Sequence, residues 1–122
     1  MTKCVVAEDE SLLRDSLLEM LAEAWPGLDV VAACEDGGSA LEAIAAHQPD
    51  VAFLDIRMPG LTGIAVAADM PHASPRTQIV FVTAYDQYAI DAFDRGAADY
   101  LLKPVARERL EATVARVKAR MA

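Results

Sequence analysis

The sequence lacks the features that mark a membrane or secreted protein. Its longest apolar stretches, such as residues 51–54 and 64–68, fall far below the roughly 20 residues that a membrane-spanning helix needs. Residues 1–3 lead straight into a short strand-like segment, without the charged region, long apolar region and cleavage site of a secretory signal. The sequence therefore predicts a cytoplasmic protein with no membrane contact.

Cysteine is scarce, and basic residues are rare over most of the chain. Cys4 and Cys34 lie inside apolar runs without CxxC spacing, so we predict buried thiols. Residues 1–102 carry 5 basic and 17 acidic side chains, whereas residues 103–122 carry 6 and 2. An acidic body repels phosphate backbones over about 8 Å at physiological salt. We therefore expect DNA to be contacted only through another domain or partner.

The composition is that of an ordinary soluble domain. Hydrophobic residues make up 54% and charged residues 25% of the 122 residues, far from the signature of disorder. A chain of this length is expected to form one domain with a real core.

Apolar runs of strand length alternate with segments of helical spacing along the whole chain. The expected strands are residues 3–8, 28–34, 51–54, 78–83 and 99–102. The expected helices are a first one capped by Ser11, with Leu12, Leu13, Leu17, Leu18 and Leu21 on one stripe, then 39–47, 64–70, 86–95 and 107–120, with residues 71–77 irregular. The strands are too apolar for one wet face, which predicts a parallel sheet covered on both sides. The fold class is doubly wound α/β, a three-layer α/β/α architecture.

Polar residues follow the apolar runs where the strands end. Glu8 and Asp9 follow the first strand, Asp55 the third, Thr83 and Ala84 close the fourth, and Lys103 with Pro104 follows the fifth. Because parallel strands all end at one edge of a sheet, and ligands bind outside that edge, we expect these residues to meet there.

Three carboxylates at one place predict a bound cation. Without one they would repel each other and their pKa values would rise as a coupled set. Carboxylate oxygens suit Mg²⁺, with Mn²⁺ as a tolerated substitute, whereas the lack of His or Cys at these strand ends argues against zinc or copper. Lys103 supplies a second positive charge.

A carboxylate beside Mg²⁺ and an ammonium group is suited to attack a phosphoryl group. Asp55 is the best nucleophile, because the turn that starts at Met58 leaves it exposed in the crevice while Glu8 and Asp9 hold the metal. Thr83 would then donate a hydrogen bond to the new phosphoryl group.

Four motifs, in this order, resemble the receiver domain of two-component response regulators. They are Glu8-Asp9-Glu10, Phe53 to Gly60 (FLDIRMPG), Val82 to Ala84 (VTA) and Tyr100 to Pro104 (YLLKP). The segment 83–93 further resembles receivers of the LytR/AlgR type. The resemblance covers essentially the whole chain. It implies that residues 1–122 form a receiver domain with a flavodoxin-like sheet of order 2-1-3-4-5, and that the output domain is absent from this chain.

The resemblance also implies a role for each matching residue. Asp55 would be the phosphoacceptor. Glu8, Asp9, Asp55 and the main-chain carbonyl of Arg57 would hold Mg²⁺. Thr83 and Lys103 would be the switch pair, Tyr100 the switch aromatic, and the small Ala84 would leave room for the phosphoryl group. A cis peptide bond before Pro104 would aim Lys103 at the site. Arg57 and Tyr85 occupy positions that tune dephosphorylation, and because both are bulky we predict a long-lived phosphoryl state.

A sensor histidine kinase is the partner that the resemblance implies. Phosphorylation would change the face formed by the helix 86–95, the strand 99–102 and the closing helix, through which the chain would also form a homodimer. Tyr88 and Phe93 are expected to be packing or dimer-face residues. The receiver would dephosphorylate itself slowly and is not expected to be a turnover enzyme. Its output would be transcription, through the missing DNA-binding domain.

Other functions remain as alternatives. The chain ends at Ala122 just after the closing helix, so it is either a stand-alone receiver acting by protein contact or a fragment trimmed at a domain boundary. A haloacid-dehalogenase-like phosphohydrolase also uses an aspartate and Mg²⁺, but it generally needs a second Asp two residues on, where this chain has Arg57. A flavodoxin-like cofactor carrier would need a Ser/Thr-rich phosphate loop after the first strand, and Glu8-Asp9-Glu10-Ser11 stands there instead.

Overall fold

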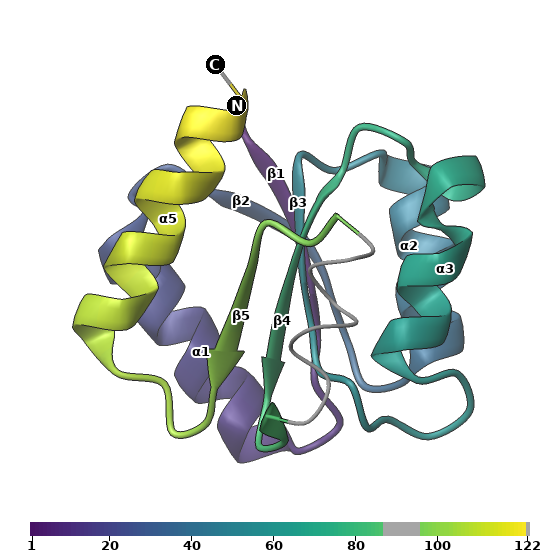
Figure 1. The fold of residues 1–122 in the computed structure, drawn as a ribbon, viewed down its shortest axis with the longest axis horizontal. Coiled ribbons are helices and arrows are strands. Elements are labelled where there is room, and N and C mark those ends of the chain that lie inside the picture. Colours follow the sequence, from purple (N-terminus) through teal and green to yellow (C-terminus); the bar gives the residue numbers. More distant parts are fainter. Residues whose placement is uncertain (87–95, 122) are drawn as a thin grey trace.

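The computed structural model describes residues 1–86 and 96–121, which fold as a parallel sheet between two layers of helices (Figure 1). Strands and helices alternate along the chain: β1 (Lys3–Ala7), α1 (Ser11–Ala24), β2 (Asp29–Cys34), α2 (Gly37–His47), β3 (Val51–Leu54), α3 (Gly63–Ala73), β4 (Gln78–Thr83), β5 (Asp99–Leu102) and α5 (Arg107–Met121). The helix expected over residues 86–95, with Tyr88 and Phe93, lies outside the described residues except for Asp86.

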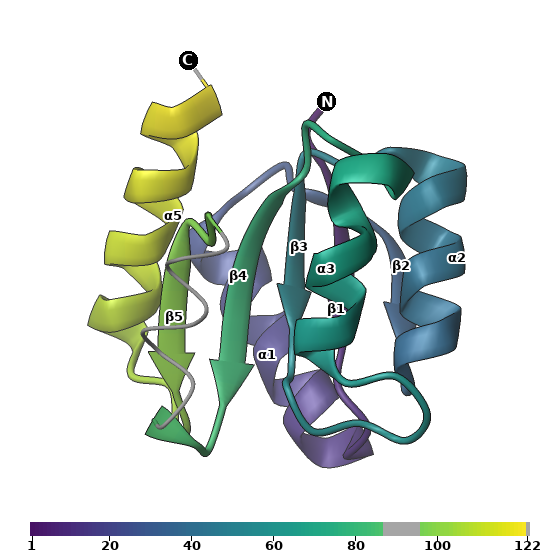
Figure 2. The same cartoon turned by 45° about the vertical axis from the view of Figure 1, so that its right-hand side comes forward.

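The five strands lie in the order β2-β1-β3-β4-β5, and every pair is parallel, which confirms the predicted doubly wound, flavodoxin-like sheet. Figure 2 shows the strands running the same way, with both chain termini at the end opposite the arrowheads. β1 and β3 lie in the middle, where chain connections leave in opposite directions. The sheet edge at the carboxyl ends of β1 and β3 is therefore where a ligand crevice is expected.

Alternate strand residues face the two helical layers, as the pleat of a strand requires. Val5, Ala52, Leu54 and Phe81 belong to the core that α2 and α3 cover. The opposite core, under α1 and α5, contains Val6, Phe53, Val80, Leu101 and Val117. Figure 1 shows the two helix pairs on opposite sides of the sheet. Both faces of the sheet are thus buried, as the apolar strands predict.

The start of α1 differs from the prediction. Ser11 is the first helical residue and not the cap; Glu10 occupies the cap position, without a side-chain capping bond. Leu17 and Leu21 are buried, but Leu12 is 83% exposed and Leu13 40%. The reason is helical geometry: at about 100° per residue, Leu12 lies about 140° around the helix from Leu17. The predicted five-leucine stripe was therefore too wide.

The other helices correct the predicted boundaries. α2 begins at Gly37, because the side chain of Asp36 accepts a hydrogen bond from Ser39 N at 2.7 Å and caps the helix. α3 runs through Pro71 to Ala73, although residues 71–77 were expected to be irregular. Pro71 has no N–H to donate to the carbonyl of Ala67, and α3 ends two residues later at Ala73.

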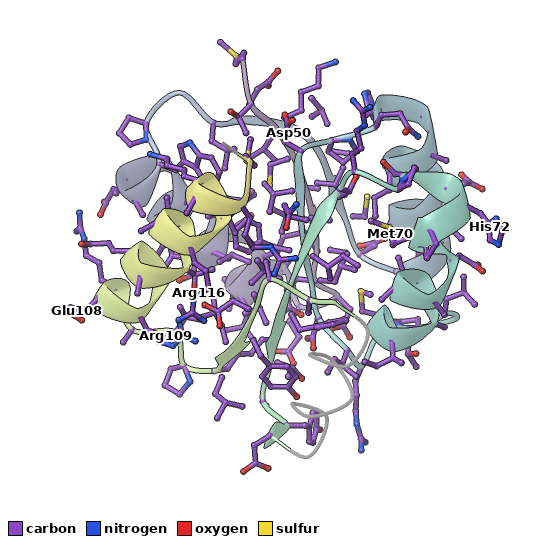
Figure 3. The ribbon with its side chains drawn as sticks, turned by 45° about the horizontal axis from the view of Figure 1, so that its top comes forward. Asp50, Met70, His72, Glu108, Arg109 and Arg116 are labelled. Atoms are coloured by element: carbon purple, nitrogen blue, oxygen red, sulfur yellow. The ribbon has the colours of Figure 1, made fainter. Side chains whose placement is uncertain are left out.

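Helix α3 has a buried and an exposed side. Figure 3 shows Met70 on the side facing the rest of the molecule and His72 projecting away from it. Met70 is accordingly buried, 3% exposed. Of the predicted buried thiols, Cys4 is buried and Cys34 is half-buried. None of the helices in the described part of the chain combines the length and apolar character that crossing a membrane requires.

Candidate functional site

The sheet register places Glu8 and Asp55 side by side. Ala7 and Leu54 are register partners at the ends of β1 and β3. The next residues continue the ladder, since Asp55 N donates to Ala7 O and Glu8 N donates to Cys34 O, both at 2.9 Å. Both side chains are buried, with Glu8 3% and Asp55 6% exposed. Two acidic groups are therefore fixed by the backbone of the sheet and not by flexible loops.

Asp9 completes a group of three carboxylates. One carboxylate oxygen each from Glu8, Asp9 and Asp55 lies within 4.8 Å of the others, and Asp9 is exposed. The structure confirms the prediction that these three residues lie close together at the strand ends. Asp9 and Asp55 of this group line a cleft of about 450 Å³, together with Arg57, Ala84 and Tyr85.

Lys103 reaches the carboxylates from β5. Lys103 N donates to Thr83 O at 2.9 Å, which extends the β4–β5 ladder by one residue. Its Nζ lies 2.8 Å from Asp55 Oδ2 and also donates to Glu8 Oε1. Burial lowers the pKa of Lys103, but hydrogen bonds and charges of Asp55 and Glu8 outweigh it and raise the pKa above its ordinary value. Lys103 is therefore a firmly charged ammonium. The Lys103–Pro104 peptide bond is cis.

The charges at the site do not balance. Burial raises the pKa of Glu8, and the nearby charge of Asp55 raises it further, while Lys103 and the backbone N–H of Glu10 lower it without cancelling these effects. Among the residues that the structure describes, the Lys103 ammonium forms ion pairs with two of the three carboxylates. The site is thus short of positive charge.

The donor set fits a hard divalent cation. Three carboxylate oxygens from two strand ends lie within reach of one ion, and Asp9 leaves one side open to solvent. Mg²⁺ is held in proteins by one or two carboxylates together with waters and phosphate oxygens, so an open acidic site of this kind suits it. Arg57, whose carbonyl was predicted as a further ligand, lines the same cleft.

Thr83 and Ala84 lie beside the carboxylates at the end of β4. Thr83 is fully buried, and its Oγ1 has no hydrogen-bond partner within the described residues. A buried hydroxyl without a partner is costly and uncommon. Ala84 is exposed and lines the cleft with Asp55 and Lys103.

Arg57 and Tyr85, both predicted to tune dephosphorylation, contact each other at the mouth of the cleft. The guanidinium carbon of Arg57 lies 4.1 Å from the centroid of the Tyr85 ring, a cation–π contact. The predicted switch aromatic, Tyr100, is buried, and its hydroxyl donates to the main-chain carbonyl of Tyr85. The long phosphoryl lifetime expected from Arg57 and Tyr85 stays a prediction.

Gly63 supports Asp55 and was not identified from the sequence as more than part of a turn. A Cβ on Gly63 would lie 2.2 Å from the carbonyl oxygen of Asp55, so no other residue fits there without a backbone shift. Gly63 N also donates to Ile56 O at 2.8 Å. The close approach places the start of α3 directly against the end of β3. The available signal was the FLDIRMPG motif followed by Leu61, Thr62 and Gly63.

Comparison with known proteins identifies relatives over most of the chain. A family model described as the response regulator receiver domain matches residues 4–115. An uncharacterized response regulatory protein from Vibrio cholerae is 54% identical over 106 residues, 87% of this chain and 41% of that protein. The transcriptional regulatory protein BtsR from Escherichia coli is 41% identical over 118 residues, 97% of this chain and 48% of BtsR. The chain thus spans less than half the length of these relatives.

Solved structures show the same fold. The REC domain of AraT, a response regulator from Geobacillus stearothermophilus, has a TM-score of 0.88 and 35% identity, covering 98% of this chain and 95% of that one. The signal receiver domain of the response regulator NarL from Mycobacterium tuberculosis has a TM-score of 0.85 and 36% identity, with 96% of both chains covered.

Proposed function

The chain belongs to the response regulator receiver domain family, and we propose that it accepts a phosphoryl group on Asp55 from a sensor histidine kinase. The observation that carries this proposal is the placement of the buried Asp55 carboxylate 2.8 Å from the Lys103 ammonium, within a group of three carboxylates. The narrower LytR/AlgR type remains a prediction from the sequence.

In the proposed reaction, a carboxylate oxygen of Asp55 attacks the phosphorus of a phosphorylated histidine. The new O–P bond forms as the P–N bond breaks, and the electron pair stays on the imidazole nitrogen, which takes up a proton from water. Lys103 lies where its positive charge offsets the negative charge on the phosphoryl oxygens. Burial of Asp55 on all sides but the cleft limits the access of water to the product.

Mg²⁺ fits this site, with Mn²⁺ as a substitute. The three carboxylates and the main-chain carbonyl of Arg57 would hold the ion. When bound, it supplies the positive charge that one lysine leaves lacking against three carboxylates and a phosphoryl group.

Thr83 and Tyr100 are proposed to report phosphorylation to the rest of the domain. Thr83 Oγ1 is buried and has no partner among the described residues, so a phosphoryl oxygen in the cleft would satisfy it. The face that includes β5 and α5 would then change its population of states and so its affinity for a partner or a second copy. Asp55 would lose its phosphoryl group slowly, so the domain is a switch and not a turnover enzyme.

The proposed output is transcription. Its support is the relative BtsR, a transcriptional regulatory protein, of which this chain covers 48%. Contact with DNA would then require a segment that the relative has beyond the matched part. A stand-alone receiver that acts by protein contact is the alternative.

Incubation of the purified chain with Mg²⁺ and a small acyl phosphate tests the proposal. We expect one phosphoryl group per chain, stable enough to isolate, and no label after chelation of the metal. Asp55→Asn should abolish the label, whereas the matched variant Asp50→Asn, at the other edge of the sheet, should keep it. A wild-type protein that stays unlabelled, or a label that survives Asp55→Asn, would contradict the proposal. Steady release of phosphate over many turnovers would instead favour a phosphohydrolase.

A further inference from the structure

We propose that the side chain of Arg57 positions Tyr100 by stacking on Tyr85, so that the mouth of the acidic cleft is mechanically connected to strand β5. The connection has two contacts, the Arg57–Tyr85 stack and the hydrogen bond from Tyr100 to the Tyr85 carbonyl. Its use as a signal rests on the proposed function, but the connection itself exists without a phosphoryl group.

The first contact is the stacking of Arg57 on the Tyr85 ring at the protein surface. Tyr85 is 37% exposed and follows Ala84 directly after β4, where the sheet ladder has ended. The Arg57 guanidinium lies 4.1 Å from its ring centroid and comes from the loop after β3. The stack therefore ties the loop after β3 to the loop after β4 across the cleft that both residues line.

The second contact links the Tyr85 backbone to the buried Tyr100. Tyr100 is 7% exposed, and its ring lies 6.2 Å from that of Phe81 in the core. Its hydroxyl donates to the main-chain carbonyl of Tyr85. A displacement of the Tyr85 backbone would therefore break or lengthen the hydrogen bond that ties Tyr85 to Tyr100.

Arg57 is placed to respond to charge in the cleft. It lies two residues after Asp55, and both line the same cleft. A phosphoryl group on Asp55 would add negative charge there, and charge-assisted hydrogen bonds to a guanidinium are stronger than an exposed cation–π contact. Phosphate and the Tyr85 ring would therefore compete for one guanidinium. A phosphoryl group in the cleft would therefore weaken the Arg57–Tyr85 stack and so change how Tyr85 holds Tyr100.

Fluorine NMR of protein containing 3-fluorotyrosine tests the connection, because the chain has only three tyrosines. The Tyr100 resonance is assigned with Tyr100→Phe. We expect Arg57→Met to shift the equilibrium of Tyr100 environments about two- to five-fold, the range that corresponds to an exposed cation–π contact. In a Tyr85→Leu background the same Arg57 substitution should have no further effect.

Three controls make the result decisive. Arg76→Met removes an exposed arginine at the opposite edge of the sheet and should leave the Tyr100 resonance unchanged. Arg57→Lys keeps the cation and should restore part of the wild-type equilibrium. Tyr85→Phe keeps the ring and should preserve the response to Arg57→Met even if Tyr85→Leu does not fold.

The connection is refuted if Arg57→Met leaves Tyr100 unchanged, or if its effect is equally large without the Tyr85 ring. These spectra are recorded without a phosphoryl donor. Acyl phosphate and Mg²⁺ are added afterwards, with the Asp55 label measured in the same samples. A missing label would refute the proposed function and leave the result on Tyr100 intact.

Discussion

Carboxylates gather at both ends of strand β5, and the two groups differ in how far nearby hydrogen-bond donors and positive charges compensate their negative charge. At its start, the fully buried Asp99 is surrounded by donors on α5. Beyond its end lie Glu8, Asp9 and Asp55, and Lys103 forms ion pairs with Glu8 and Asp55. One region is electrostatically complete, while the other lacks positive charge.

Asp99 is matched by more donors than a single carboxylate needs. Arg109 donates to both its oxygens at 2.6 and 2.8 Å, Thr113 at 2.6 Å, and Arg116 lies 3.2 Å away. Figure 3 shows both arginines projecting from α5. Burial alone would raise the pKa of Asp99, but these bonds, the backbone N–H of Tyr100 and the charge of Arg109 lower it to about 2. This arrangement serves to hold α5 against β5.

The contrast separates a structural acid from functional ones. A fully satisfied buried carboxylate has nothing left to bind, whereas Glu8 keeps a raised pKa despite its contact with Lys103. Perturbed groups that lie in a cleft with unsatisfied charge are candidates for chemistry. The positive charge that the acidic cleft lacks is what a metal ion and a phosphoryl transfer would use.

Removing the charge of Asp99 should cause the largest loss of stability. Loss of one partner of a buried ion pair costs about 3 to 5 kcal/mol, and because both arginines are partly exposed we expect Asp99→Asn to cost about 3 kcal/mol. Glu8→Gln should cost less than 1 kcal/mol, since it also removes repulsion. Urea unfolding of both variants measures the two free energies. Equal losses would erase the distinction between the two regions.

Addition of Mg²⁺ should stabilise one region only. At 100 times its Kd, a ligand that binds only the folded state raises the free energy of unfolding by about 2.7 kcal/mol. We expect this gain in the wild type and in Asp99→Asn, but much less in Asp9→Asn, which lacks one carboxylate of the group. Thermal unfolding with and without the ion is the measurement. A full gain in Asp9→Asn would exclude this group as the metal site.

The two regions should depend on pH with opposite signs. Asp99 has a pKa of about 2 in the folded state against an ordinary 3.8, so its stabilisation is complete above pH 3.8 and is lost as the pH falls towards 2. At about 1.4 kcal/mol per pKa unit, that contribution is about 2 to 3 kcal/mol. The pKa of Glu8 is raised above 4.5, so its contribution is complete below pH 4.5 and is lost as the pH rises through the raised value.

Unfolding titrations of the wild type, Asp99→Asn and Glu8→Gln between pH 2 and 8 would show these signs as differences between curves. The gap between wild type and Asp99→Asn should close in acid. The wild type should lose stability relative to Glu8→Gln as the pH rises. If the difference in free energy of unfolding between the wild type and either variant changed with pH in the opposite direction, the cause assigned to the pKa of that residue would be wrong.

The smallest effect is expected for Arg116. It is 53% exposed and lies farther from Asp99 than Arg109 does. Because exposed ion pairs contribute about 0 to 1 kcal/mol, Arg116→Gln should lower the free energy of unfolding by less than 1 kcal/mol. Arg109→Gln, which removes two hydrogen bonds to the buried carboxylate, should cost more. The reverse order would show that Arg116 is the main partner.

The same two regions show what the sequence could and could not predict. The acidic cleft was predictable because its residues directly follow apolar runs, and parallel strands bring such positions together at one edge. The Asp99 network was missed because Arg109 and Arg116 lie on a helix whose rotation about its axis depends on tertiary packing. Gly63 was missed as a support of Asp55 for a similar reason, because a close backbone approach leaves no pattern beyond a glycine.

Errors at helix ends also have a tertiary origin. Leu12 was predicted to share one apolar stripe with four other leucines, but the buried side of α1 is set by Leu17 and Leu21. Pro71 was expected to interrupt α3, but the helix continues for two residues beyond it, to Ala73. Local propensity fixed the element types here, while packing decided their bounds and faces.

The most direct test of the central claim is to locate the phosphoryl group. Borohydride reduction of the chain treated with acyl phosphate and Mg²⁺ converts a phosphorylated aspartate into homoserine, which peptide mass spectrometry assigns to one residue. The account predicts conversion at Asp55 and retention of Glu8, Asp9 and Asp99. Conversion at another carboxylate, or at none while phosphate is consumed, would contradict it.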